Sequence, residues 1–223
     1  MKVLIACEES QTVCKAFRKL GHEAYSCDTK DCSGGHPEWH IKGNVLDIIY
    51  DGWDLLIGHP PCTYISYAGV AHWNKPGRLE KRLDALAFFA KLWNAPIERI
   101  CLENPKGCAS PTIAKYSQEI QPYYFGEPQL KTTWIWLKGL PKLKWSQKDD
   151  LFSLATSSGK PEPLEIQIRK PSKNYNGGEL KKRYFTDAGT KDSQRRSKTF
   201  QGIADAMAIQ WGGDIRNFNP TNL

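Results

Sequence analysis

Residues 2–28 read KVLIACEESQTVCKAFRKLGHEAYSCD, in which two short apolar runs flank a stretch of helical character. The run KVLIAC at 2–7 is apolar at nearly every position, as in a strand that is buried on both faces of a parallel sheet. Apolar side chains recur at helical spacing in TVCKAFRKLG at 12–21, and the glycine that ends this stretch is suited to a helix C-terminus. The run EAYSCD at 23–28 predicts a second strand, so the whole stretch predicts a βαβ unit.

The same alternation of strand and helix patterns continues along the chain. The longest helical pattern, RLEKRLDALAFFAKLWNA at 78–95, predicts an amphipathic helix. Its expected buried face consists of Leu79, Leu83, Leu86, Ala90 and Trp93. Further elements are expected at NVLDI (44–48), WDLLIGHPPC (53–62), ERICLENP (98–105) and KTTWIWLKGLP (131–141). We therefore predict an α/β fold with a doubly wound, mostly parallel sheet of the Rossmann-like type.

Composition divides the chain into three parts. Residues 1–143 carry the strand and helix patterns and form the expected core. Residues 144–198 contain turn-forming stretches such as SSGKPEP and KPSKNYNGG, which predict a short irregular insertion. In residues 199–223, the stretch TFQGIADAMAIQWGG predicts a helix that packs back onto the core.

The excess positive charge of the chain lies in one segment. Residues 138–198 hold fifteen Lys and Arg against seven Asp and Glu, whereas the first 137 residues hold fifteen of each. Such a segment suits contacts with nucleic-acid phosphates, and a merely solvated basic surface is the alternative. The residues that we expect to face DNA are Lys181, Lys182, Arg183, Arg195, Arg196 and Lys198.

The overall composition is that of an ordinary globular protein, with 40% hydrophobic and 25% charged residues. The first ten residues, MKVLIACEES, turn acidic too early for a signal peptide or a membrane span. Seven Cys without short, regular spacing favour free thiols over disulfides. We therefore expect a cytoplasmic monomer that has no membrane association and no obligate protein partner.

Three polar features follow predicted strands: Asp28, the stretch from His59 to Cys62, and the pair Glu103–Asn104. The carboxyl ends of parallel strands meet at one edge of a sheet, where α/β proteins bind their ligands. In HPPC, two prolines stiffen the turn that presents Cys62, which makes this thiol a candidate nucleophile. The alternative is a buried structural thiol, which is the interpretation given to Cys7, Cys14, Cys27 and Cys101.

The motif LENP at 102–105 is the second signal. Its proline stops the strand directly after Glu103 and Asn104, so the carboxylate is presented at the strand end. A surface Glu that opens a turn is the alternative for this motif alone.

The stretch KDCSGGHPEWH contains Cys32, His36 and His40, which are residue types that bind zinc. No fourth ligand is evident, so we predict no metal site. This loop is expected instead to close over the cofactor or over the strand ends.

Several motifs together resemble the cytosine-5 DNA methyltransferases, in particular the short phage and prophage members. The resemblance rests on ACEESQTVCKAFRKLGHEAYSCD (6–28), WDLLIGHPPCTYIS (53–66), LENP (102–105), YFGEPQLKTTWIWLKGLP (124–141) and RSKTFQGIADAMAIQW (196–211). It implies an S-adenosylmethionine-dependent fold, DNA as substrate, and a cytoplasmic location in a bacterial host.

The resemblance also implies a role for each motif. Cys62 is the nucleophile that adds to carbon 6 of a flipped cytosine, and Glu103 stabilises ring nitrogen 3 while Asn104 fixes its loop. A further family loop, Gln-x-Arg-x-Arg, corresponds to Gln129 and Lys131, with Thr133 in place of the second Arg. Lys keeps the charge of the first Arg but loses its planar fork.

The cofactor loop departs further from the family pattern. Where the family has Phe-x-Gly-x-Gly, this chain has no glycine between Cys7 and Thr12. Asp28 corresponds to the acid that holds the ribose hydroxyls, and Asn44 to the acid that meets the adenine amino group. The residues expected to bind S-adenosylmethionine are Cys7, Glu8, Glu9, Ser10, Asp28, Asn44, Pro60 and Pro61.

Two other functions are compatible with these departures. One is a catalytically altered or inactive methyltransferase-like protein that only binds DNA. The other is an enzyme that adds a different one-carbon group to cytosine. The intact Cys62 and Glu103 favour an active cytosine-5 methyltransferase.

Overall fold

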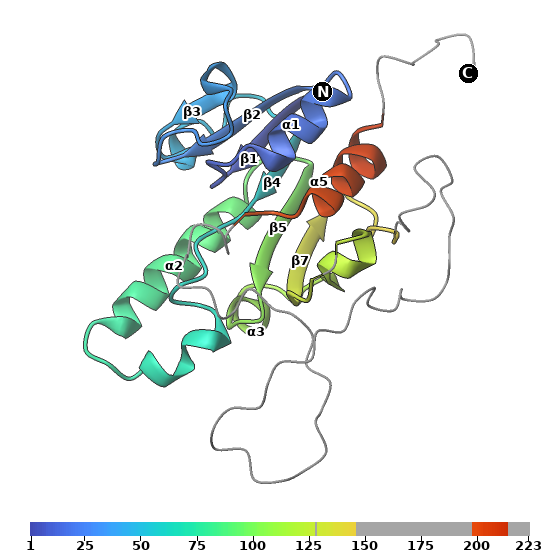
Figure 1. The fold of residues 1–223 in the computed structure, drawn as a ribbon. Coiled ribbons are helices and arrows are strands. Elements are labelled where there is room, and N and C mark those ends of the chain that lie inside the picture. The colour runs from blue at the N-terminus through green and yellow to red at the C-terminus, as the bar shows by residue number, and fades with distance from the viewer. Residues whose placement is uncertain (128, 146–197, 214–223) are drawn as a thin grey trace, which may run out of the picture.

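The computed structural model describes residues 1–127, 129–145 and 198–213. These residues form a seven-stranded sheet in the order β3-β2-β1-β4-β5-β7-β6 (Figure 1). The strands are β1 (Lys2–Ala6), β2 (Glu23–Asp28), β3 (His40–Lys42), β4 (Leu55–Gly58), β5 (Arg99–Pro105), β6 (Gln118–Ile120) and β7 (Thr133–Lys138). Strands β3, β2, β1, β4 and β5 are mutually parallel, and only β7 runs against its neighbours. The predicted mostly parallel α/β sheet is confirmed.

Helices cover both faces of this sheet (Figure 1). The α-helices are α1 (Thr12–Lys19), α2 (Arg78–Trp93), α3 (Ala109–Thr112) and α5 (Gln201–Met207), which continues into a π-helical turn, η6 (Ala208–Gly212). The 3₁₀ turns are η1 (Pro37–Trp39), η2 (Val45–Asp47), η3 (Tyr67–His72) and η4 (Pro122–Phe125).

Alternate residues of each strand supply two separate hydrophobic cores. Ile5 of β1 points to the face covered by α1 and α5, where it lies in one core with Phe17 and Ile203. Its neighbour Leu4 points to the opposite face and lies in a second core with Phe89 of α2. The doubly wound arrangement therefore follows from an apolar strand that is buried on both sides.

The C-terminal helix packs against α1. Its residues Ile203, Met207 and Trp211 are all buried, as their helical spacing predicts. The proposed division of the chain at 143/144 and at 198/199 stays a prediction, because nearly all of the middle segment lies outside the described residues.

The buried face of α2 differs from the predicted one. Phe89 and Leu92 are its buried residues, whereas Leu79 and Leu83 are each more than half exposed. The first turns of α2 extend beyond the sheet, so their leucines have no strand to pack against (Figure 1). The apolar side chains of α2 cover more than one face of the helix. The helical period alone does not show which of these faces packs on the sheet.

The third element also differs from the prediction. The stretch NVLDI contains the 3₁₀ turn η2, and the edge strand β3 lies just before it at His40–Lys42. A three-residue edge strand carries too short a pattern to be seen in the sequence. All seven cysteines are free thiols, in agreement with the prediction.

Candidate active site

Three loops meet at one edge of the sheet, because β1, β4 and β5 are parallel neighbours that end there. The loop after β1 begins at Cys7, the loop after β4 contains His59–Cys62, and β5 ends with Glu103, Asn104 and Pro105. The amide of His59 bonds the carbonyl of Ala6 at 2.9 Å, which ties the β4 loop to β1. The sheet therefore brings the main sequence motifs to one place.

The loop that carries Cys62 is fixed to the end of β5. The side chain of Asn104, which is 2% exposed, donates from Nδ2 to the carbonyl of Pro60 at 2.7 Å. The Cys62 carbonyl accepts the amides of Ile65 and Ser66, at 3.2 and 2.9 Å, so Cys62 opens a tight turn. The thiol side chain is thus held in a constrained, partly buried position.

The segment after Cys62 and the segment after Pro105 are also joined by hydrogen bonds. The amide of Tyr67 bonds the carbonyl of Lys106, and the amide of Cys108 bonds the carbonyl of Ile65, both at 2.9 Å. Gly107 lies so close to the Ile65 carbonyl that a Cβ at this position would collide with it. A glycine is therefore required where the two segments cross, and their relative position is rigid.

His59 and Glu103 form a pair at the centre of this arrangement. His59 Nδ1 lies 2.8 Å from Glu103 Oε2, and the two side chains are only 9% and 12% exposed. Burial by itself would lower the pKa of His59, but the hydrogen bond to Glu103 and the charges of Glu103 and Glu8 hold this pKa above its ordinary value. These interactions favour the charged form of the pair, in which an imidazolium faces a carboxylate.

The start of β7 and the segment before it add two groups beside Glu103. Burial would raise the pKa of Glu103, but the His59 hydrogen bond, the Lys131 charge and the Thr133 hydroxyl outweigh it and keep the pKa below its ordinary value. Lys131 and Thr133 occupy the positions at which the family motif has two Arg. Within the described residues, the amide of Gln129 bonds the carbonyl of Glu127 in its own loop.

The loop after β1 achieves its path without glycine. Cys7 and Gln11 both adopt the left-handed backbone conformation, with φ of 60° and 58°. This conformation costs about 1–2 kcal/mol for a non-glycine residue and is found mainly at functional sites. Although this loop contains no glycine, its backbone adopts the left-handed conformation at Cys7 and Gln11.

Glu8 of this loop occupies the N-terminus of α1. Its two carboxylate oxygens accept the amides of Val13 at 2.7 Å and Cys14 at 3.2 Å. Burial raises the pKa of Glu8, against the opposing effects of His59 and of these two amides. The backbone donors that could have bound a phosphate are thus already taken by a side chain of the protein.

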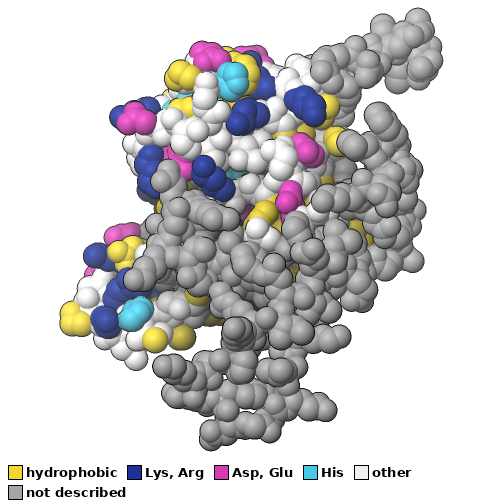
Figure 2. All heavy atoms as spheres, in the orientation of Figure 1, with side chains coloured by type: hydrophobic (Ala, Val, Ile, Leu, Met, Phe, Trp, Pro, Cys, Tyr) yellow, Lys and Arg dark blue, Asp and Glu magenta, His cyan; other side chains and the backbone are white. Residues whose placement is uncertain are grey.

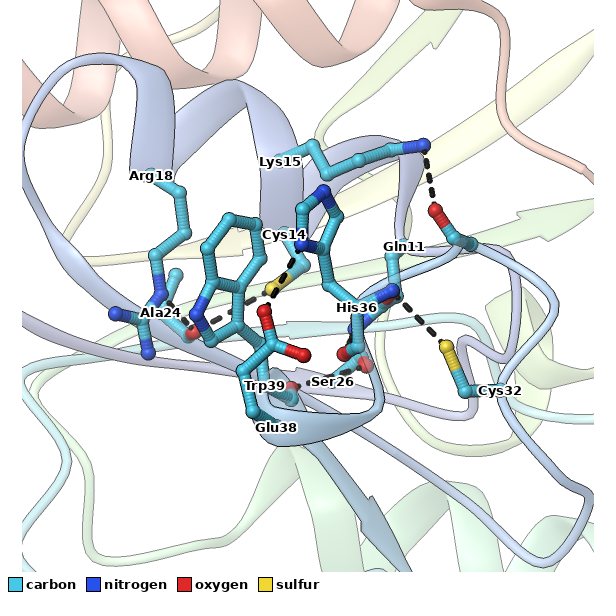
Figure 3. Close-up of polar contacts among 11 residues, drawn as sticks. Gln11, Cys14, Lys15, Arg18, Ala24, Ser26, Cys32, His36, Glu38 and Trp39 are labelled. Atoms are coloured by element: carbon cyan, nitrogen blue, oxygen red, sulfur yellow. Dashed lines mark hydrogen bonds and ion pairs between the residues drawn. The ribbon is translucent and has the colours of Figure 1, made fainter.

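The segment 32–36, which we name the strap, folds over the same loop (Figure 3). Gln11 is completely buried beneath it and donates from Nε2 to the carbonyl of His36 at 2.8 Å. Its Oε1 accepts the His36 amide and the Cys32 thiol, at 3.1 and 3.0 Å. Lys15 of α1 adds a bond to the carbonyl of Gly34 at 3.1 Å. The loop that was predicted to close over the cofactor or the strand ends packs on the β1–α1 loop.

The three candidate zinc ligands have separate partners. Cys32 bonds Gln11, the ring of His36 stacks on Trp39 at 3.9 Å, and His40 lies between Ser26 and the carbonyl of Lys30 (Figure 3 shows the first two). No group of metal-binding side chains occurs within residues 1–127, 129–145 and 198–213.

The two remaining cofactor candidates lie at the ends of β2 and β3. Asp28 is partly exposed and accepts the amide of Lys30 at 2.9 Å. The side-chain oxygen of Asn44 accepts the amide of Leu46 at 3.1 Å and so caps η2. The oxygen expected to meet an adenine amino group thus already has one backbone partner.

The other cysteines near the site have high pKa values. Burial raises the pKa of Cys7 to about 12 and that of Cys27 to about 11, and the charge of Asp28 acts in the same direction. Such thiols stay protonated near neutral pH, which agrees with the structural role predicted for them.

Of the residues expected to face DNA, only Lys198 lies within the described residues, where it is exposed. The other five lie outside them. On the face drawn in Figure 2, the Lys and Arg side chains that are described are interspersed with Asp and Glu. None of the described helices combines the length and the apolar character needed to cross a bilayer.

No family model and no curated protein matches this sequence. Among solved structures, the chain is similar to a candidate DNA modification methyltransferase encoded within a prophage of E. coli, with 14% identity, a TM-score of 0.42, and coverage of 79% of this chain and 62% of that one. It is also similar to the S. pombe Dnmt2 methyltransferase, with 17% identity, a TM-score of 0.46, and coverage of 76% and 61%. A Spodoptera frugiperda DNMT2 triple mutant matches with 14% identity, a TM-score of 0.41, and coverage of 76% and 60%. The chain spans about three fifths of the length of these proteins.

Two residues of this site, His59 and Thr133, had no role assigned to them from the sequence. His59 stands directly before the two prolines, and Thr133 was noted only as a departure from a motif. Their common feature is proximity to Glu103, which depends on the order of β4, β5 and β7 in the sheet.

Proposed function

We propose that this chain is an S-adenosylmethionine-dependent methyltransferase that methylates carbon 5 of cytosine in DNA, with Cys62 as its nucleophile. The observation that carries the proposal is the rigid connection between the Cys62 loop and the Glu103 strand end, made by Asn104 and by the crossing at Gly107. Covalent catalysis needs a nucleophile and a stabilising group in fixed relative positions. The motif resemblance supplies the identity of the substrate.

The geometry of the first loop favours this cofactor over a dinucleotide. A pyrophosphate needs free amides at a helix N-terminus, and here the Glu8 carboxylate occupies those of Val13 and Cys14. S-adenosylmethionine has no phosphate. Asp28 at the end of β2 suits its ribose hydroxyls, as in the comparable dinucleotide arrangement.

The residues proposed to hold the cofactor contribute in different ways. Glu8 is bonded to α1 and Glu9 to Ser33 of the strap, so their side chains serve to shape the loop. We therefore assign their cofactor contacts, and those of Cys7 and Ser10, to the backbone of this loop. When bound there, S-adenosylmethionine would supply an electrophilic methyl group.

The proposed chemistry begins at Cys62. Its thiolate forms a bond to carbon 6 of cytosine, and the π electrons of the ring move toward ring nitrogen 3, which takes a proton under the influence of Glu103. The resulting enamine is nucleophilic at carbon 5, which would take the methyl group as the methyl–sulfur bond of S-adenosylmethionine breaks, leaving S-adenosylhomocysteine. Loss of the proton from carbon 5 and breakage of the bond to carbon 6 then release the product and the thiolate. Because ring carbons are inaccessible in a duplex, the base must be flipped into the site.

Covalent trapping tests this proposal. We would prepare random-sequence duplex DNA in which 5-fluorocytosine replaces cytosine and incubate it with the protein and S-adenosylmethionine. Fluorine cannot leave carbon 5 as a proton does, so the adduct at Cys62 should accumulate and shift the protein on a denaturing gel.

The controls separate the alternatives. The Cys62→Ser variant should bind the same DNA without forming an adduct, and omission of S-adenosylmethionine should leave no stable band. If the wild-type protein binds this DNA but forms no adduct under any condition, it is a DNA-binding protein and the proposed reaction is wrong. Mass analysis of unfluorinated product DNA identifies the transferred group.

A further inference from the structure

His59 and Glu103 are joined by a short hydrogen bond. The contact from Nδ1 to Oε2 measures 2.8 Å and spans two neighbouring strands, since His59 follows β4 and Glu103 ends β5. The second ring nitrogen, Nε2, is also buried, and within the described residues it has no hydrogen-bond partner. The Glu103 carboxylate is therefore the hydrogen-bond partner of this imidazole, through Nδ1.

The charged groups around His59 favour its protonated form. Glu103 faces it from β5, Glu8 faces it from the loop after β1, and Lys131 opposes them from the segment before β7. Two carboxyl groups outweigh one ammonium group, and the pKa of His59 is raised even though burial opposes this. The pKa of Glu103 is lowered in turn, so the carboxyl group alone carries no proton near neutral pH.

An ionised Glu103 beside the target base requires a proton between the carboxylate and ring nitrogen 3. Ring nitrogen 3 of neutral cytosine has a lone pair, and an ionised Glu103 also presents lone pairs, so the two repel unless a proton lies between them. When Cys62 adds to carbon 6, nitrogen 3 becomes far more basic and needs that proton. The group in contact with Glu103 that carries a transferable proton is His59.

We propose that His59 is a positioning residue that acts through Glu103, as the reservoir of the proton delivered to the target base. The inference rests on the proposed function. As the bond from sulfur to carbon 6 forms, the Nδ1 proton passes to the Glu103 carboxyl group, and this group gives a proton to nitrogen 3. The imidazole is left neutral and Glu103 is ionised again. When the bond to carbon 6 breaks, nitrogen 3 returns its proton by the same route and the imidazolium is restored.

The test is the pH dependence of methyl transfer in single turnover, at saturating DNA and S-adenosylmethionine. In the wild-type protein, the rate should fall as pH rises above the raised pKa of the pair, because the reservoir empties. In His59→Gln, the rate near neutral pH should fall by about two to four decades, the range for a lost acid–base function. The variant should regain activity at acidic pH, where Glu103 itself becomes protonated. His40→Gln, which removes a histidine of β3 that bonds Ser26 of β2, should keep the wild-type profile.

A second measurement does not depend on catalysis. Titration of the His59 ring by NMR should give a higher pKa in the wild-type protein than in Glu103→Gln, in which the carboxylate is absent. If His59→Gln keeps the wild-type pH profile, or if the His59 titration does not respond to Glu103→Gln, the reservoir role is wrong. The 5-fluorocytosine adduct of the wild-type protein tests the underlying reaction separately, so the two failures are distinguishable.

Discussion

Glu8 stabilises the loop between β1 and α1 through its side chain. In a loop that contains no glycine, its buried carboxylate accepts the amides of Val13 and Cys14 in α1, and Cys7 and Gln11 take up the left-handed conformations. Low-polarity surroundings disfavour the charged form of a buried carboxylate. The stability of the protein can therefore depend on pH through this group. The loop is therefore specified by side-chain hydrogen bonds rather than by backbone freedom.

We expect Glu8 to make stability depend on pH. Burial raises its pKa above the ordinary value of 4.5, so the folded state favours the protonated form. The corresponding stability is complete below pH 4.5 and is lost as the pH rises through the higher pKa of the folded state. Glu8→Gln keeps an acceptor oxygen for the α1 amides and does not titrate. The free energy of unfolding of the wild-type protein, relative to Glu8→Gln, should fall as the pH is raised from 4.5. A constant difference between pH 4 and 8 would contradict this account.

At the scale of elements, the strap joins the β2–β3 connection to the N-terminus of α1. Its bonds to Gln11, Lys15 and the Glu9 carbonyl enclose a loop that would otherwise be open to water. Within the strap, Gly34 packs closely against Gln11 and the Ser10 carbonyl. The strap thus fixes the loop that is proposed to hold the cofactor.

Gly34→Ala should destabilise the protein. An added Cβ would lie 2.5 Å from the Cβ of Gln11 and 2.6 Å from the carbonyl oxygen of Ser10, so the strap must lift away from the loop. Overpacking of this kind costs about 1–3 kcal/mol. Gly43→Ala is the matched control, because a Cβ there meets nothing within 4 Å, and its effect should stay within about 0.5 kcal/mol. Urea unfolding measures both, and equal stabilities of the two variants would show that the strap is not tightly packed.

At the scale of the whole molecule, the charge is unevenly distributed. The first 137 residues are balanced, and residues 138–198 carry essentially all of the excess. Under the proposed function, the balanced first 137 residues would carry out catalysis and the basic segment would bind phosphates, so DNA affinity and methyl transfer should respond to different substitutions.

We therefore expect Lys181→Ala/Lys182→Ala/Arg183→Ala to weaken DNA binding and to leave single-turnover methylation at saturating DNA nearly unchanged. Six phosphate contacts give a slope of about −5 for log affinity against log salt, and removal of three should flatten it by about half. Binding titrations at several salt concentrations measure the slope. Lys19→Ala/Lys75→Ala/Lys91→Ala removes the same charge from exposed positions elsewhere and should change the slope less. Equal slopes for the two triple variants would remove this segment from DNA recognition.

The sequence by itself determined the class of fold and the position of the main motifs. Apolar runs at β1, β4 and β5 mark strands that are buried on both faces, and their polar ends place Cys62 and Glu103 at one edge. These features are local, because each depends on the pattern of a few consecutive residues. The buried helical face of Ile203, Met207 and Trp211 was predictable for the same reason.

Only the tertiary structure decided which side chains meet across that edge. His59 and Glu103 are 44 residues apart and pair because β4 and β5 are neighbours, and Thr133 joins them because β7 runs back along β5. The exposed Leu79 and Leu83 of α2 reflect the extent of the sheet, which the helical period does not contain. Periodicity fixes which face of an element is apolar, whereas contacts between distant residues depend on strand order, register and the limits of each layer.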